Sequence, residues 1–317
     1  MAVVAGTDKP TAAQYNSIQT TMNTVLATRW GQTPSSSQLT LPGTSTKITS
    51  AAWTNLRSDI LKANRHIYLV ANRGTLTDPT TSTVIAAADY NAYETMANDS
   101  STNYLQFPYD HPLGSINSVG FQMSSIPQWG RSTRSKLQYV LLGRFPSNAG
   151  ARYFYNSGGQ TRFDTILTGA GVANVGSKDY SWRSAVNEMG TLVMTANATT
   201  SINTTAGLGG TGSAIGWYQL TTSDQLVFSK STTTYSPNSI KIYARCNGDP
   251  ATTATILTLT IVYFDENDPA GTYTIDEDVG ATFQVNLASY YSSGTGEVNV
   301  TGYRPNLELS TGPTVLA

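Results

Sequence analysis

The segment Thr253-Ala-Thr-Ile-Leu-Thr-Leu-Thr-Ile-Val-Tyr-Phe264 has the strongest β-propensity in the chain. Its β-branched and aromatic residues favour the pleated surface of a sheet. Shorter segments of similar composition, bounded by turn residues, predict further strands at 136–142, 151–155, 160–167, 190–196, 215–220, 225–229, 239–245, 281–287 and 297–301. Only one short helix is expected among them, at 181–188. Strands without alternating helices predict an antiparallel β-sandwich, or a jelly-roll-like domain, over residues 107–317.

Residues 1–106 have a different pattern, with three similar segments at 11–22, 49–60 and 86–97. Aligned on Tyr15, Trp53 and Tyr90, these segments recur after 38 and 37 residues, which is a spacing typical of helical repeats. Large residues follow each aromatic at i+3, so each segment has the apolar face of an amphipathic helix. Three unrelated helices with alanine-rich first turns would look the same. Either way, the sequence predicts a small N-terminal α-helical domain in a chain that is otherwise mainly β.

The composition is poor in charge and rich in hydroxyl groups. Asp, Glu, Lys and Arg make up 12% of the 317 residues, about half the usual share, whereas Ser and Thr together number 79. With 20 acidic and 19 basic residues, the chain has no excess of positive charge to attract nucleic acid or an anionic membrane. No apolar run approaches the roughly 20 residues of a membrane span, and the single Cys246 excludes an internal disulfide. Composition therefore excludes several classes of protein without identifying a function.

Residues typical of enzyme active sites are scarce. The only histidines are His66, expected at the end of the second helix, and His111, near the junction of the two regions. We interpret both as structural. The segment 207–212 matches the Gly-x-Gly-x-x-Gly dinucleotide fingerprint, but no predicted helix follows it, so we interpret it as a loop. The sequence predicts no catalytic residue and no cofactor.

Acidic residues concentrate in one place, where Asp265, Asp268, Asp276 and Asp278 flank a short predicted hairpin. Carboxylates brought together from two loops can bind calcium, although their spacing is not that of an EF-hand. The same loops are also typical of ordinary solvated turns. We therefore expect no metal ion and keep these four residues as the candidate ligands.

Five segments carry a resemblance to a known group of proteins: 31–39, 47–66, 154–163, 215–222 and 254–264 with the acidic turn that follows it. They look similar to virion structural proteins of tailed bacteriophages, especially cyanophage-like myoviruses. The resemblance covers most of the chain and lies in the general character of the sequence, without a catalytic signature. It implies a structural role in the particle, at the neck, tail, baseplate or a fibre.

The resemblance also implies partners and a location. It is that of a non-enzymatic virion protein, which contacts other virion proteins and further copies of itself in a symmetric assembly. A host surface glycan is an additional candidate partner, whereas nucleic acid and membrane are not expected. We expect the helical region to anchor the subunit and the sandwich to form its body. The candidate residues of the assembly interface are Tyr15, Trp53, Leu56, Ile60, Tyr90 and Tyr93.

Two alternative functions remain open. In a receptor- or carbohydrate-binding adhesin, exposed aromatic side chains would stack on sugar rings, with Tyr290, Tyr291 and Trp217 as the first candidates. In a depolymerase, carboxylates of the acidic cluster, such as Asp265 and Asp276, would cleave host polysaccharide.

Overall fold

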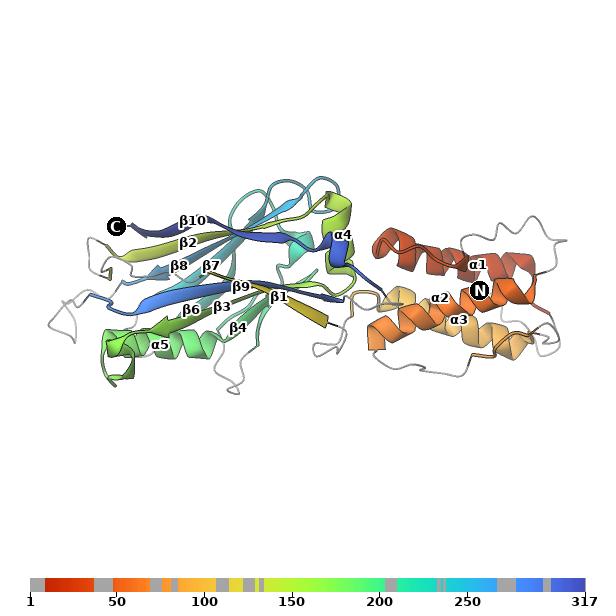
Figure 1. Cartoon of the computed structure of the whole chain (residues 1–317), viewed down its shortest axis with the longest axis horizontal. Helices are drawn as coiled ribbons and strands as arrows, with labels where there is room; N and C mark the ends of the chain where they lie inside the picture. The colour runs from red at the N-terminus through yellow and green to blue at the C-terminus, as the bar shows by residue number, and fades with distance from the viewer. Residues whose placement is uncertain are drawn as a thin grey trace. The chain divides into compact units, whose positions relative to one another are not determined.

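A computed structural model describes residues 9–36, 48–68, 76–80, 85–106, 114–121, 129–130, 134–202, 210–232, 235, 238–266, 278–292 and 298–316 (Figure 1). The chain forms two compact units. The first contains Met1–Ser115, Arg152–Gly158 and Tyr291–Gly302. The second contains Ile116–Ala151, Gly159–Tyr290 and Tyr303–Ala317. The helical unit therefore includes two segments from beyond residue 106, where the sequence alone predicted a single boundary.

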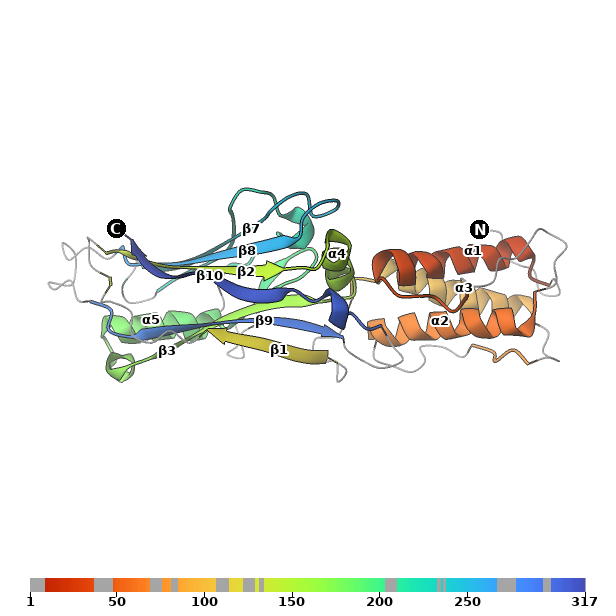
Figure 2. The same cartoon turned by 45° about the horizontal axis from the view of Figure 1, so that its top comes forward.

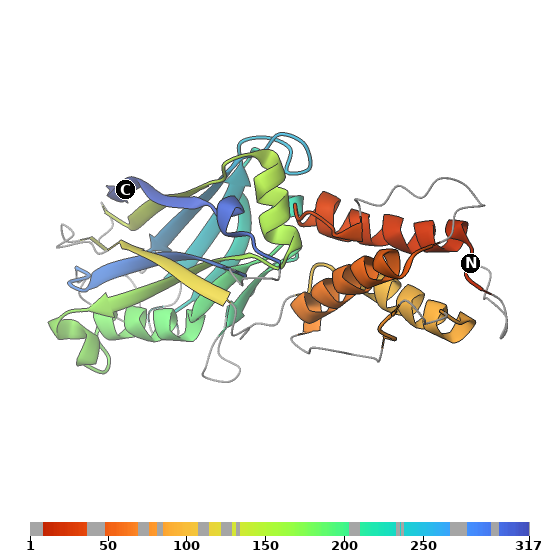
Figure 3. The same ribbon diagram turned by 45° about the vertical axis from the view of Figure 1, so that its right-hand side comes forward.

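Three helices in the described part of the first unit correspond to the three similar segments. They are α1 (Ala12–Asn23), which continues into a π-helical turn η1 (Thr24–Arg29), α2 (Ser50–Tyr68) and α3 (Ala87–Thr102) (Figure 3). Thr11 begins α1 with a capping box that includes Gln14. The Thr49 hydroxyl accepts a hydrogen bond from the Ala52 amide at 3.2 Å, as expected for the residue that begins α2. Local capping signals thus set where these helices begin.

The aromatic faces of the three helices meet in the core of the first unit. Tyr15 and Trp53 pack edge to face with 5.0 Å between ring centroids, and Trp53 and Tyr93 do the same at 5.2 Å. The Tyr15 hydroxyl donates to the Ala52 carbonyl oxygen at 2.9 Å. These rings are buried, so their packing contributes both apolar burial and favourable edge-to-face contacts.

Trp30, which follows η1, binds a segment from much later in the chain. Its indole Nε1 donates to the carbonyl oxygens of Asn156 and Tyr104, at 2.9 and 3.2 Å. The His66 ring lies edge-on to Trp30, with 4.8 Å between centroids, and its Nε2 lies 2.8 Å from the Ser157 carbonyl oxygen. Because a carbonyl oxygen only accepts, Nε2 is the donor in this bond. These contacts explain why residues around 156 belong to the helical unit.

Gly31 lies against the Tyr153 ring in a left-handed conformation. Its φ is +65°, and a Cβ there would lie 2.5 Å from Tyr153 Cδ2. Gly176 has a φ of +91°, but nothing lies within 4 Å of its Cβ position. We expect Gly31→Ala to lower the free energy of unfolding by about 2–4 kcal/mol, because it adds overpacking to backbone strain. Urea denaturation should show a loss at least twice that of Gly176→Ala, and equal losses would contradict the close packing of Tyr153.

The second unit consists mainly of two five-stranded sheets, which form two layers (Figure 2). Their strand orders are β1-β9-β3-β4-β5 and β10-β2-β8-β7-β6. The strands are β1 (Gly114–Phe121), β2 (Lys136–Arg144), β3 (Gln160–Thr168), β4 (Thr191–Met194), β5 (Thr199–Ile202), β6 (Gln225–Ser231), β7 (Ser239–Cys246), β8 (Ile256–Phe264), β9 (Thr282–Ser292) and β10 (Asn306–Leu316). Every pairing whose register is described is antiparallel. β8, the segment with the strongest β-propensity, occupies the centre of its sheet between β2 and β7.

A helix and a short bridging segment close one side of the sandwich. β4 pairs with β3 only as far as Phe163, and α5 (Lys178–Met189) lies beside the rest of β3 (Figure 1). Thr211 forms a bridge with Ser229 of β6, and Ser213 forms one with Thr199 of β5. The edges of the two sheets are therefore joined on this side.

Aromatic and hydroxyl groups connect the two layers inside the sandwich. The Tyr139 hydroxyl on β2 donates to the Phe283 carbonyl oxygen on β9 at 3.1 Å. The hydroxyl groups of Thr165 and Tyr263, from β3 and β8, lie 2.6 Å apart. The rings of Tyr263 and Phe283 have centroids 4.6 Å apart. The core thus consists of inward side chains of both sheets, as expected for a sandwich.

Seven of the ten predicted strands are present, namely β2, β3, β4, β6, β7, β8 and β9. The helix predicted at 181–188 is also present, as α5. Three strands were not predicted, namely β1, β5 and β10. The strands predicted at 215–220 and 297–301 are absent from the described residues. These residues instead form irregular chain with the 3₁₀ turns η4 (Trp217–Gln219) and η5 (Thr301–Tyr303). A further 3₁₀ turn, η3 (Ala170–Ala173), precedes α5. Helices and strands occupy about equal shares of the described chain, so the expectation of a mainly β protein holds only in part.

The strand predicted at 151–155 is wrong, because these residues belong to helix α4 (Asn148–Asn156). Ala151, Phe154 and Tyr155 are fully buried, and their spacing of i, i+3 and i+4 is that of one helix face. The Ser147 hydroxyl accepts from the Gly150 amide at 2.9 Å at the start of this helix. The aromatic content suggested a strand, whereas the spacing of the buried residues is helical.

Because several tyrosine hydroxyls are buried, we expect the stability of the fold to fall at alkaline pH. Burial raises the pKa of Tyr15, Tyr93, Tyr139 and Tyr263 well above the usual 10.0, and burial followed by a hydrogen bond to Glu94 raises the pKa of Tyr90 to about 12. Since the folded state holds these protons more tightly, its stability is complete below pH 10 and falls as pH rises towards and beyond 12. We expect unfolding and tyrosine ionisation to coincide in an alkaline titration followed by circular dichroism and phenolate absorbance. Full ionisation of a still-folded protein would contradict this expectation.

Candidate functional site

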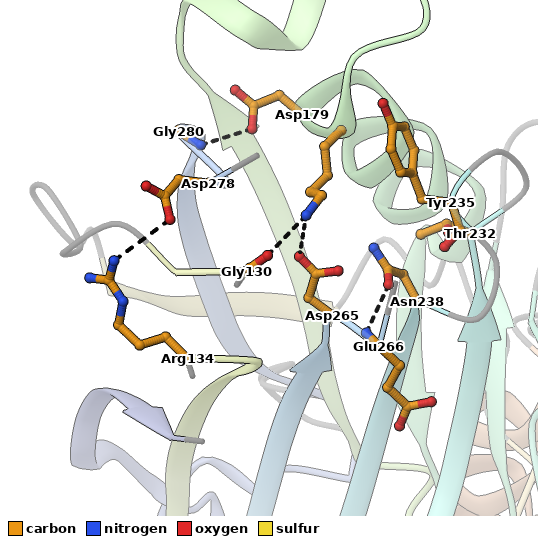
Figure 4. Close-up of polar contacts among 11 residues, drawn as sticks. Gly130, Arg134, Asp179, Thr232, Tyr235, Asn238, Asp265, Glu266, Asp278 and Gly280 are labelled. Carbon is orange, nitrogen blue, oxygen red and sulfur yellow. Dashed lines mark hydrogen bonds and ion pairs between the residues drawn. The ribbon is translucent and has the colours of Figure 1, made fainter. Parts of the chain in front are cut away.

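The described part of the acidic cluster lies at one end of the sandwich (Figure 4). Asp265, directly after β8, has a carboxylate oxygen 2.9 Å from the Lys178 Nζ, and the exposed fractions of the two side chains are 1% and 2%. The same Nζ donates to the Gly130 carbonyl oxygen at 2.9 Å. Asp268 and Asp276 lie outside the described residues. The cation next to Asp265 is therefore a lysine ammonium of the chain itself.

The neighbouring acidic side chains also have partners within the protein. Asp278 lies 3.7 Å from the Arg134 guanidinium. Asp179, in the first turn of α5, accepts from the amides of Gly280 and Ala281 at 3.0 and 3.2 Å. These contacts join α5 to the start of β9 and are ordinary stabilising interactions of acidic residues. Among the described residues, no three histidine, cysteine or acidic side chains are grouped as metal ligands would be.

Three aromatic residues that lie close in sequence to Gly130, Lys178 and Asp265 contact one another. Trp182 lies one turn after Lys178 on α5, and its ring contacts Trp129 with 5.4 Å between centroids. Tyr263, two residues before Asp265, lies 6.0 Å from Trp182. All three rings are fully buried. A carboxylate in this position is enclosed by protein and does not face a cleft that could admit a polysaccharide.

The six candidate interface residues lie inside the helical unit. Tyr15, Trp53, Leu56, Ile60, Tyr90 and Tyr93 are all buried by the chain itself. Because they form the core that holds α1, α2 and α3 together, they are not available to a second subunit in the folded chain. Several exposed positions of these helices carry small neutral residues, among them Ala13, Thr20, Thr54 and Thr95, and one, Arg65, carries a charge.

The three aromatic residues considered for sugar stacking are also buried. Trp217 is packed against Phe145 with 5.3 Å between ring centroids, and Tyr291 is 2% exposed. The Arg162 guanidinium covers the ring of Tyr290 at 3.8 Å from its centroid. None of the three presents an open ring face to a ligand.

A row of polar side chains on the outer face of β3 and β9 was not recognised from the sequence. It consists of Gln160, Arg162, Asp164, Gln284 and Asn286, which we call the polar row. Arg162 donates to Gln160 Oε1 at 3.0 and 2.8 Å, and Asn286 donates to Asp164 Oδ1 at 2.6 Å. Alternation along β3 and β9 places these residues opposite the inward Phe163 and Val285. That alternation is visible in the sequence and could have identified the row.

The remaining residues that the sequence singled out either make contacts that stabilise the fold or lie outside the described residues. The buried Cys246 thiol donates to the Gly248 carbonyl oxygen at 2.8 Å, and burial raises its pKa. Gly210 and Gly212 lie in the segment that bridges the two sheets, and the rest of the glycine motif up to Gly209 lies outside the described residues, as does His111. Lys178 was missed because a lone lysine at a helix start has no distinguishing sequence signal.

No family model, no curated protein and no solved structure matches this chain. In the described part of the chain, no helix combines the length and the apolar character needed to cross a membrane.

Proposed function

We propose that the protein is a non-enzymatic structural subunit of a tailed-phage virion, located at the neck, tail, baseplate or a fibre. The observation that carries the non-enzymatic part is the use of the acidic cluster: Asp265, Asp278 and Asp179 all bind groups of the protein itself. The resemblance in sequence supports the virion assignment. The neutral, hydroxyl-rich composition also supports it, because charged residues are depleted at the centres of protein interfaces.

Assembly in this proposal uses the outer faces of the helical unit rather than its aromatic core. Around the exposed Ala13, Thr20, Thr54 and Thr95, a neighbour could pack against uncharged side chains of α1, α2 and α3. The sandwich forms the body of the subunit, and we propose a jelly-roll-like arrangement for it because the chain alternates repeatedly between the two sheets. Homo-oligomers around a symmetry axis fit a repeated virion part.

Electron microscopy of the intact particle tests this proposal. We expect the sandwich and the helical unit to be recognisable in density at a symmetric position, and the protein to be present in purified virions by mass spectrometry. Purified infectious particles that lack the protein would overturn the assignment.

The polar row favours a second candidate function, binding to a host surface glycan. Its guanidinium, carboxylate and amide groups present donors and acceptors side by side, which suits the hydroxyl groups of a sugar. On a glycan array, the full chain would then bind defined sugars, and Asn286→Ala would weaken binding about tenfold or more, as loss of a hydrogen-bonding group does. Thr260→Ala, on the outer face of β8, is the matched control and should bind normally. Absence of binding to any glycan would exclude this function.

A further inference from the structure

Among the ion pairs of the described residues, Lys178 and Asp265 have the least exposed side chains. Their side chains are 2% and 1% exposed, and the Nζ and Oδ2 atoms lie 2.9 Å apart. The other lysine–carboxylate pair among the described residues, Lys230 with Glu188, has a similar distance of 2.6 Å but exposed fractions of 15% and 16%. Among the described residues there are thus two pairs of the same chemistry, of which one is enclosed and one is reached by water.

The backbone of Gly130 lies close to both side chains of the enclosed pair. Gly130 has a φ of +91°, and a Cβ at this residue would lie only 2.5 Å from Asp265 Oδ2. The Gly130 carbonyl oxygen also accepts from Lys178 Nζ at 2.9 Å. The amine therefore donates to both a carbonyl oxygen and the carboxylate, and Figure 4 shows Gly130 and Asp265 next to each other at this point. The Gly130 backbone therefore contacts both members of the pair.

An ion pair alone gives a poor account of this arrangement. Removing both charges from water offsets much of their attraction, so buried pairs contribute little net stability. Lys178 also lies in the first turn of α5, where the helix amides disfavour positive charge. In the same described cluster, the indole N–H groups of Trp129 and Trp182 and the Ser181 hydroxyl have no hydrogen-bond partner. This part of the core is therefore not a fully satisfied polar network.

We propose that Lys178 and Asp265 condense to form an intramolecular isopeptide bond. Proton transfer from the ammonium to the carboxylate gives the amine and the acid. The Nζ lone pair then attacks Asp265 Cγ, a new Nζ–Cγ bond forms, and one Cγ–O bond breaks. Of the three ammonium protons, one stays on the amide and two leave with the carboxylate oxygen as water. The pair contains every atom of the products, so no oxidant, nucleotide or other co-reactant is needed.

Two features of the fold favour this reaction. Holding the amine and the carboxyl group in contact replaces a bimolecular encounter by an intramolecular one, which can correspond to effective concentrations of about 10⁵ M or more. The two side chains are only 2% and 1% exposed, so water has little access and the reverse hydrolysis is disfavoured. The bond would join the start of α5 to the end of β8 across 87 residues of sequence. It would tie the helix that closes the side of the sandwich to its central strand, whether or not the virion assignment holds.

Intact-mass spectrometry of the denatured wild-type chain tests the proposal without any variant. We expect a mass about 18 Da below that of the sequence, which corresponds to the loss of one water. In a tryptic digest, Lys178 would be blocked, so the peptide 163–183 should appear linked to the peptide 246–317, which remains whole because Arg304 precedes a proline. A wild-type chain at its full sequence mass, with the peptide 163–178 recovered free, would overturn the proposal.

Two variants separate this bond from other reactions that release water. Lys178→Arg keeps the positive charge but has no amine, so it should restore the full sequence mass. Lys230→Arg changes the exposed pair with Glu188 and should leave both the mass deficit and the linked peptide unchanged. A deficit that persists in Lys178→Arg would mean cyclisation elsewhere in the chain, and it would exclude the bond between Lys178 and Asp265.

Discussion

Asp265→Ala is expected to lower the free energy of unfolding by at least about 3–5 kcal/mol, the usual effect of removing one partner of a buried ion pair, and loss of the proposed isopeptide bond would add to this effect. The substitution leaves the Lys178 amine enclosed without the carboxylate that it binds in the wild type, while the Gly130 carbonyl oxygen can still accept from it. Urea denaturation, followed by fluorescence of the buried tryptophans, measures this change directly.

Two controls show whether burial is the cause. The double variant Lys178→Met/Asp265→Leu removes both polar groups and should lose less stability than Asp265→Ala, since no unpaired charge remains. Glu188→Ala removes the partner of Lys230 at a position that water reaches and should change stability by less than about 1 kcal/mol. If Asp265→Ala were as mild as Glu188→Ala, the end of the sandwich would have to be open to solvent, contrary to the structure.

Trp30→Ala is expected to lower the free energy of unfolding by about 3–5 kcal/mol, which is typical of a buried tryptophan. Trp30 is fully buried, and its Nε1 donates to the carbonyl oxygens of Asn156 and Tyr104. Loss of the ring removes the edge-on contact with His66 as well. The expected result is a protein whose helical unit unfolds at lower urea concentration, measured by far-ultraviolet circular dichroism.

Trp30→Phe distinguishes the packing of the ring from its hydrogen bonds. Phenylalanine keeps much of the buried area but leaves the Asn156 carbonyl oxygen without its indole donor, so we expect a smaller loss of about 1–3 kcal/mol. A fragment of residues 1–106 should lose more stability than Trp30→Phe does, because it lacks the segments Arg152–Gly158 and Tyr291–Gly302 of its own unit. A stable, fully helical fragment 1–106 would contradict the role that we assign to Trp30.

The local pattern of the sequence was sufficient for most of the fold. The i+3 spacing after Tyr15 and Trp53 predicted helices that are present, and β-branched runs predicted the central strands, including β8. The errors arose where one signal outweighed another. Tyr153 and its aromatic neighbours suggested a strand in a segment that forms α4. Aromatic composition favours a strand, whereas the spacing of the buried residues in this segment is helical.

The candidate site could be predicted only in part. The sequence singled out Asp265 by its acidic neighbours, but it suggested a metal ligand, whereas the residue binds Lys178. The partner lies 87 positions away, and neither residue has a local pattern that depends on the other. Similarly, an apolar helix face is the same whether it meets another helix of the chain or a second subunit, so Trp53 could be assigned to an interface from sequence alone.

The sequence by itself determined the positions of the three N-terminal helices, most of the strands and the neutral, hydroxyl-rich character of the chain. These properties follow from spacing and composition within short segments. Only the tertiary structure decided what covers each apolar face, which distant segment binds Trp30, and which cation lies beside Asp265. The physical reason is that burial and ion pairing depend on how segments meet in space. The sequence pattern shows which face of a helix or strand is apolar, but not which distant segment packs against that face.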